Sequence, residues 1–262
     1  MLAAGCIKDP EGPAPPQRPE WLLNRVVQIT ESYGGSPLPG DPPLSRSKAL
    51  FEIIYNSHYK PVTRYSYFST VRNDTASLRL YTTDSLVYDG QFRIKEMYTW
   101  RPEGDTLAAG KFYYEGNDTL PSRVEGRSGQ TRYVYGADTV LAIFENPKSG
   151  PDTTWYVYEN GNFRRYLTSE YTVEIYEEYD NGPVIERCMN LQLSNIFNLP
   201  FHMGATPRLS HGNWGVNVFM DQARRSILYN EHGLPVASTA AVYVPSVERY
   251  KSRYEYMATA AD

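Results

Sequence analysis

The chain has 262 residues, of which 41% are hydrophobic and 21% charged, a composition typical of a folded protein. Its 26 basic and 30 acidic residues leave a net charge of −4 and no polybasic run, which argues against nucleic acid or an electrostatically bound membrane as a partner. Two cysteines are too few for a disulfide framework or a zinc site, and we expect no metal ion and no cofactor. Tyrosine is abundant, with 23 residues, which favours β-strands.

Small residues precede Cys6 near the start of the chain. This arrangement resembles the lipobox of bacterial lipoproteins, and the resemblance implies a diacylglycerol anchor on the Cys6 thiol. The charged and apolar parts of a signal peptide are missing from the sequence, and the alternative is an accidental cysteine. Asp9 and Glu11 follow Cys6 and look like the acidic signal with which Bacteroidetes place lipoproteins on the cell surface.

Five prolines lie between residues 10 and 19, where neither a helix nor an interior strand can form. Such a segment is a semi-rigid tether with a polyproline-like conformation. We therefore divide the chain into a lipobox remnant with a Pro-rich tether, residues 1–20, and a single antiparallel β domain, residues 21–262. A tether behind a lipid anchor would lift that domain off the membrane.

From Trp21 onward, apolar and polar residues alternate with period two, which predicts strands with one buried face. Residues 92–100 place four apolar or aromatic side chains on one face: Phe92, Ile94, Tyr98 and Trp100. Residues 250–256 set Tyr250, Tyr254 and Tyr256 against Lys251, Arg253 and Glu255. Glycine and proline recur between such segments, so long helices are not expected.

A strand–turn–strand unit repeats along the body of the chain. Each unit has a tyrosine, then a polar turn with Gly or Asp, and then a second strand. The last tyrosines before the turns are Tyr88, Tyr114, Tyr135, Tyr158, Tyr179 and Tyr229. Each ring is expected to pack across its hairpin. Their spacing describes successive hairpins in a meander, interrupted by one irregular insertion at about residues 188–224.

The order of these units resembles the Bacteroidetes lipoproteins of unknown function whose domain is called porin-like, most clearly where residues 229–235 precede the closing tyrosines. A more distant resemblance is to the YD-type repeats of large secreted bacterial proteins. The resemblance implies a strongly curved antiparallel sheet and brings no established catalytic residues. Independently, about 12–16 strands exceed the roughly 10 that an open sheet tolerates. The expected fold is all-β, an antiparallel meander of repeated hairpins that forms a strongly curved sheet or half-open barrel.

Six Asp-Ser or Asp-Thr pairs recur, each followed by an apolar residue or threonine. They resemble the three-residue O-glycosylation motif of exported Bacteroidetes proteins, which implies sugars on the hydroxyls of Thr75, Ser85, Thr106, Thr119, Thr139 and Thr153. Turn chemistry is the alternative, because Asp binds nearby backbone amides and Thr opens the next strand. The two interpretations are compatible, since a sugar needs an exposed loop.

The insertion breaks the hairpin rhythm and carries two of the four histidines. A long loop inside a compact domain is usually functional or a cap. Trp, Asn and His side chains suit stacking on a sugar ring and hydrogen bonding to its hydroxyls. The candidate ligand patch is Asn198, His202, His211, Asn213 and Trp214. The alternative is a lid over one end of the curved sheet.

The sequence contains no nucleophile elbow and no phosphate-binding glycine loop, and we expect no enzyme and no catalytic residues. The expected protein is an outer-membrane lipoprotein on the cell surface that binds a glycan or an envelope partner such as an outer-membrane transporter. Charged strand faces favour membrane contact through the lipid anchor only. Two alternatives stay open: a periplasm-facing structural lipoprotein of an envelope assembly, and a hydrolase with a site in residues 195–215.

Overall fold

The structure is a computed structural model, and it describes residues 19–34, 41–69, 73–148, 150–160, 162–168, 172–180, 182–183, 187–189, 191, 216–217, 223–242 and 247–259. These residues form sixteen strands and one short 3-10 helix, η1 (Arg187–Met189). The strands are β1 (Trp21–Tyr33), β2 (Ser45–Tyr55), β3 (Pro61–Ser69), β4 (Leu78–Tyr88), β5 (Ile94–Trp100), β6 (Thr106–Tyr113), β7 (Arg123–Gly126), β8 (Gly129–Tyr135), β9 (Thr139–Asn146), β10 (Gly150–Glu159), β11 (Asn162–Thr168), β12 (Thr172–Glu177), β13 (Val216–Asn217), β14 (Ala223–Tyr229), β15 (Pro235–Val242) and β16 (Val247–Ala258).

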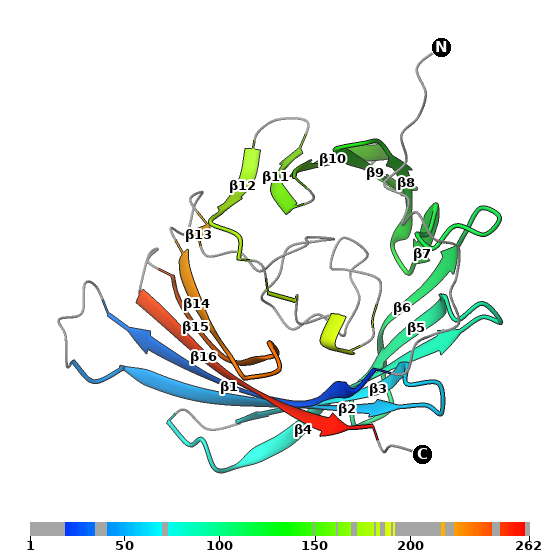
Figure 1. Cartoon of the computed structure of the whole chain (residues 1–262). Helices are drawn as coiled ribbons and strands as arrows, with labels where there is room; N and C mark the ends of the chain where they lie inside the picture. Colours follow the sequence, from blue (N-terminus) through cyan, green and yellow to red (C-terminus); the bar gives the residue numbers. More distant parts are fainter. Residues whose placement is uncertain are drawn as a thin grey trace.

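Each strand pairs antiparallel with its neighbours in the chain, and β16 pairs with β1, so the sheet closes on itself as a barrel (Figure 1). The closing pair joins Trp21 to Ala258 at one end and Tyr33 to Val247 at the other. The wall is narrowest at β13, which pairs two residues with β12 and two with β14. The predicted all-β meander with strong curvature is confirmed. The first and last strands pair and complete the ring.

The hydrophobic core lies on the inner face of the ring. Val26 of β1 and Tyr254 of β16 are cross-strand partners, and they are only 3% and 4% exposed. Cys188 and Met189 of η1, together with Leu191, belong to the same cluster, and Figure 1 draws η1 inside the ring. The lid interpretation of the insertion stays a prediction, because residues 195–215 lie outside the described part of the chain. Among the described residues, no helix has the length and apolarity needed to cross a membrane.

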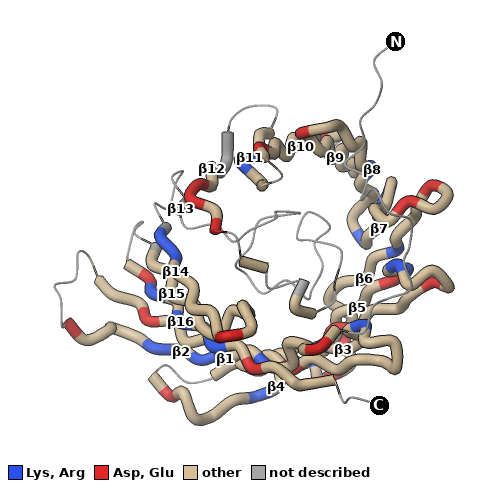
Figure 2. The backbone as a smooth tube through the Cα atoms, in the orientation of Figure 1, with Lys and Arg blue, Asp and Glu red and all other residues tan. Residues whose placement is uncertain are grey.

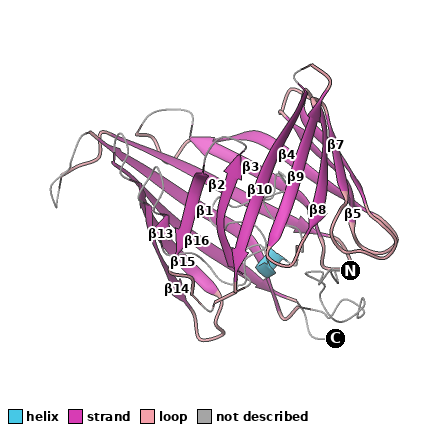
Figure 3. Ribbon diagram, turned by 90° about the horizontal axis from the view of Figure 1, so that it is seen from above, coloured by secondary structure: helices cyan, strands magenta, loops and turns pink. Residues whose placement is uncertain are grey.

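The barrel has two ends that differ in their connections. At the turn end, β1 and the other odd-numbered strands begin and the even-numbered strands finish. At the loop end, the odd-numbered strands finish and the even-numbered strands begin. Figure 3 shows η1, in cyan, toward one end of the barrel rather than at its middle. Cys188 of η1 interacts with Tyr55 and Tyr256, which lie near the ends of β2 and β16 where these strands finish, so this helix lies toward the turn end.

Tyrosines at the turn end bind carbonyl groups of the neighbouring strand. Tyr88 Oη donates to the carbonyl oxygen of Pro61 at 2.8 Å, and Tyr114 Oη donates to that of Ile94 at 2.8 Å. The same relation joins Tyr55 to Leu23, Tyr135 to Pro121, Tyr179 to Phe163 and Tyr256 to Pro235. Burial raises the pKa of the hydroxyls of Tyr55, Tyr88, Tyr114, Tyr135 and Tyr256. These hydroxyls therefore reach back to the preceding strand rather than across the following turn, because that strand offers a buried carbonyl as partner.

The alternation predicted for residues 92–100 fails in β5. The register against β4 shifts by one residue between Ile94 and Glu96, which is a β-bulge. After the bulge, Met97 faces the core and is 8% exposed, whereas Tyr98 and Trp100 face outward. The prediction that Tyr98 and Trp100 share a face with Ile94 was wrong, because the extra residue turns the following side chains over.

Candidate functional site

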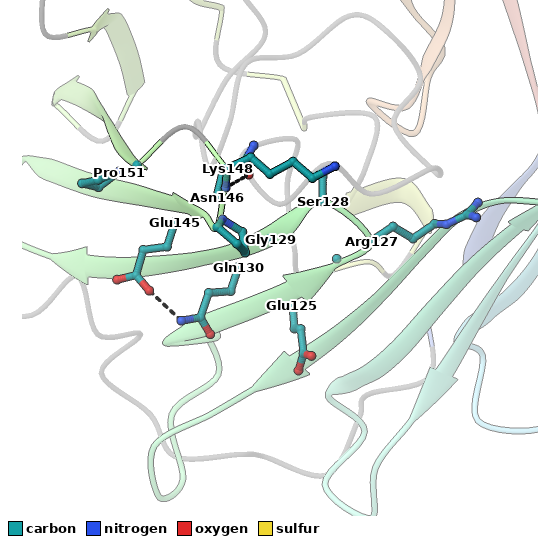
Figure 4. A pocket seen from close by; sticks show the side chains of 12 residues that line it. Glu125, Arg127, Ser128, Gly129, Gln130, Glu145, Asn146, Lys148 and Pro151 are labelled. Atoms are coloured by element: carbon teal, nitrogen blue, oxygen red, sulfur yellow. Dashed lines mark hydrogen bonds between the residues drawn. The ribbon is translucent and has the colours of Figure 1, made fainter.

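A hollow of about 960 Å³ opens at the loop end, between the β7–β8 and β9–β10 hairpins. Residues 125–130 form one side, and residues 145–148 with Gly150 and Pro151 form the other. We call it the polar hollow, because charged, amide and hydroxyl side chains line it. Figure 4 shows Gln130 and Glu145 joined by a hydrogen bond, with Lys148 extended near Ser128.

Gly129 sets the close approach of the two hairpins. Its φ is +155°, and a Cβ added there would lie 2.3 Å from the carbonyl oxygen of Glu145. Cross-strand pairing places Gln130 directly opposite Glu145. Only glycine permits such an approach of two backbones, so the shape of the polar hollow depends on this residue.

The carboxylates of the polar hollow are held by hydrogen-bond donors. Glu145 accepts from Gln130 Nε2 at 2.6 Å and from Arg132 Nε at 2.8 Å. Both hydrogen bonds lower the pKa of the Glu145 carboxyl, and the one from Gln130 has the larger effect. Glu125 accepts from the hydroxyl of Tyr113 at 2.7 Å. Both carboxylates are therefore fixed in position as hydrogen-bond acceptors.

The setting of Glu145 bears on the chemistry that this carboxyl can perform. A general acid needs a carboxyl that stays protonated near neutral pH, and the lowered pKa of Glu145 has the opposite effect. In the part of the chain that the structure describes, no three His, Cys, Asp or Glu residues gather where they could hold a metal ion. Fixed acceptors and donors in an open hollow fit a ligand that carries many hydroxyl groups.

A second polar cluster lies on the inner wall. Arg64 Nη2 of β3 is 2.8 Å from Asp84 Oδ2 of β4, and Thr99 Oγ1 of β5 donates to Asp84 Oδ1 at 2.7 Å. Burial lowers the pKa of Arg64, and the charge of Asp84 opposes that change. Turn chemistry, the alternative explanation of the Asp-Ser/Thr pairs, does not apply at Asp84, because its carboxylate is buried within β4 and paired with Arg64.

The hydroxyl residues of the Asp-Ser/Thr pairs occupy different settings. Thr75 follows Asp74, whose Oδ1 accepts from the amide of Ala76 at 2.8 Å, as turn chemistry requires. Thr119 is exposed between β6 and β7, Thr106 and Thr139 begin β6 and β9, and Ser85 and Thr153 lie within β4 and β10. The Asp152 carboxylate likewise accepts from the amide of Thr153 at 2.7 Å, so turn chemistry does not account for Ser85 but is present at Thr75 and Thr153. Glycosylation of these residues stays a prediction.

Other predicted site residues lie outside the described part of the chain: Cys6, Asn198, His202, His211, Asn213 and Trp214.

The sequence analysis did not predict the polar hollow. Its two sides come from separate turns, Arg127-Ser128 and Pro147-Lys148, which have ordinary turn composition. Nothing in either segment alone indicates that the register of β8 with β9 brings them together.

No protein-family model matches the chain, and no curated protein matches it. Among solved structures it is similar to a porin-like protein from Bacteroides uniformis ATCC 8492. The two share 9% sequence identity, with 90% of this chain and 98% of that chain covered, at a TM-score of 0.46. A likeness this distant says nothing about a ligand or a site.

Proposed function

We propose that the protein is a non-catalytic, lipid-anchored barrel of the bacterial cell envelope that binds a glycan in the polar hollow. The observation that carries the proposal is the position of this hollow at the loop end. The chain enters the barrel at the opposite end, where the amide of Thr259 donates to the carbonyl of Glu20 at 3.1 Å. An anchor at Cys6 would therefore lie on the turn-end side and leave the polar hollow facing away from the membrane.

The outer wall supports a barrel that stands in water. Arg25 lies on the face of β1 opposite to the buried Val26. Its guanidinium is 3.5 Å from the carboxylate of Glu255 and 3.9 Å from that of Glu52. A wall immersed in lipid needs an apolar outer band, and charged side chains there are costly. Figure 2 shows charged positions distributed around the ring. Attachment through a lipid fits this wall better than burial in the bilayer.

Intact mass measurement of protein isolated from the native membrane fraction tests the anchor. We expect a mass above that of the 29.9 kDa chain by the lipid, and loss of this increment and of membrane association in Cys6→Ser. A bare polypeptide mass in the wild type would contradict lipidation. Repeated sugar increments in the same spectrum would support the Asp-Ser/Thr residues as glycosylation sites.

Protease treatment of intact cells tests the side of the membrane. Digestion of the domain supports the cell surface. Protection in intact cells, followed by digestion after the outer membrane is permeabilised, would favour the periplasm-facing structural alternative. Glycan binding is tested by retardation of the purified protein in native gels that contain a polysaccharide.

A further inference from the structure

Two aromatic side chains form a pair on the outer wall near the polar hollow. Tyr98 and Trp100 of β5 stack with ring centroids 5.5 Å apart and an interplanar angle of 14°. Both side chains are partly exposed. The bulge in β5 turns them outward, although the neighbouring sequence pattern would bury them. A pair of aromatic rings on a wetted wall offers apolar surface to a ligand.

Three positions on the neighbouring strands beside this pair carry hydroxyl groups, and the Tyr98 hydroxyl itself donates to Glu96 Oε2 at 2.6 Å. Thr83 of β4 is the cross-strand partner of Trp100, and Ser85 is that of Tyr98. On the other side, Thr106 of β6 pairs with Trp100. We call these five residues the aromatic shelf. Rings flanked by hydroxyls match a sugar, which presents C–H groups on its faces and hydroxyls at its edges.

The aromatic shelf continues into the polar hollow through Arg127. Nη1 of Arg127 donates to the carbonyl oxygen of Thr106 at 2.5 Å, and Arg127 is itself part of the lining of the hollow. Figure 4 shows its side chain extended away from Gln130. Strands β5, β6, β7 and β8 are consecutive neighbours in the sheet. The aromatic shelf and the polar hollow are therefore adjacent, because each of these strands contributes residues to one or the other.

The charge of the lining indicates the class of ligand. Two acidic and two basic residues line the polar hollow: Glu125, Glu145, Arg127 and Lys148. The Glu96 carboxylate, which accepts from Tyr98, adds one acidic group beside them. The surface therefore has no excess of positive charge that would select an anionic ligand.

We infer that the aromatic shelf and the polar hollow form one binding surface for an extended, uncharged polysaccharide. One sugar ring stacks on Tyr98 and Trp100, and the chain continues past Arg127 to the donors and acceptors of the hollow. This inference rests on the proposed glycan-binding function and adds the place of binding and the class of glycan.

Native affinity electrophoresis tests the inference with the full-length protein. The gels contain hydroxyethylcellulose or mannan as uncharged probes and polygalacturonate as a charged probe. We expect retardation of the wild type by at least one uncharged probe and none by polygalacturonate. Trp100→Ala and Tyr98→Ala should each weaken the apparent affinity about fivefold or more, and Trp100→Phe should retain most of it.

Trp155→Ala is the matched control. Trp155 lies on β10 between Leu141 and Leu167, in an apolar part of the sheet, and its loss should leave retardation unchanged. Circular dichroism shows whether each variant is folded, and Trp100→Phe keeps the test valid if Trp100→Ala does not fold.

Equal retardation of the wild type and all shelf variants would overturn the role of the aromatic shelf in binding while leaving glycan binding itself intact. Stronger retardation by polygalacturonate would overturn the uncharged class, and no retardation by any probe would overturn glycan binding itself.

Discussion

Arg64 and Asp84 form a double hydrogen-bonded ion pair across β3 and β4, with side chains only 10% and 1% exposed. Removing one partner leaves a buried charge without its counter-ion. We expect Asp84→Ala to lower the free energy of unfolding by about 3–5 kcal/mol, measured by urea titration. The double variant Arg64→Met/Asp84→Leu should lose less, because no charge remains unpaired.

Arg132→Ala is the control for this prediction, because its ion pair with Glu145 is half-exposed. It should cost no more than about 1 kcal/mol. If Asp84→Ala were no more costly than Arg132→Ala, the buried pair would not stabilise the barrel in the way described.

The setting of Glu31 leads us to expect that the free energy of unfolding depends on pH. It is 3% exposed and accepts from Lys251 Nζ at 2.8 Å and Arg46 Nη2 at 2.5 Å. The hydrogen bond from Lys251, with that from Arg46, lowers the pKa of Glu31 in the folded protein from its ordinary value of 4.5. Its stabilising effect is therefore complete above the unfolded pKa and is lost as the pH falls through the folded pKa.

Glu31→Gln measures this effect directly. Proton linkage predicts that the difference in unfolding free energy between wild type and variant is constant between about pH 6 and 8. The difference should shrink below about pH 4.5, where the Glu31 carboxylate of the wild type becomes protonated. A difference that grew on acidification would show that the sign is wrong.

The tyrosines of the turn end should stabilise the barrel through single hydrogen bonds. Tyr88→Phe removes the donor to Pro61, whose buried carbonyl then has one partner fewer. We expect a loss of about 1–2 kcal/mol in the free energy of unfolding. Tyr81→Phe deletes the same hydroxyl from a side chain that is 54% exposed, and should change stability by less than about 0.5 kcal/mol.

The two glycines of the β7–β8 hairpin give a matched pair for the polar hollow. Gly129→Ala places a Cβ 2.3 Å from a backbone carbonyl and should cost more than about 2 kcal/mol while weakening glycan retardation. At Gly126 the nearest atoms to an added Cβ are 3.8 Å away, so Gly126→Ala should have little effect on either measurement. Similar melting temperatures for the two variants would contradict the close approach.

Local sequence predicts most of the strands and few of their contacts. In β16 the alternation works, since Tyr254 is buried whereas Lys251 and Arg253 are exposed. In β5 it fails, because the bulge depends on the register with β4 and has no signature in residues 92–100. Closure of the ring could not be predicted, since it depends on pairing between Trp21 and Ala258, at opposite ends of the chain.

The polar hollow was unpredictable for a related reason. Turn composition shows that residues 127–128 and 147–148 connect strands, but not which turns meet in space. The irregular insertion at about residues 188–224 stays a prediction, because most of it lies outside the described residues. The burial of Cys188 and Met189 inside the barrel follows from packing that the sequence does not display.

The pairing of β1 with β16 also constrains how the molecule is made. β1 is among the first strands to leave the ribosome or an export channel, and its second edge has no partner until the last strand has followed. During that interval an open edge thirteen residues long is available to other chains, which is the usual beginning of strand-mediated aggregation. Arg25 and Glu31, the two charged residues of β1, therefore have a further role during synthesis, because charged side chains on an open strand edge discourage premature pairing.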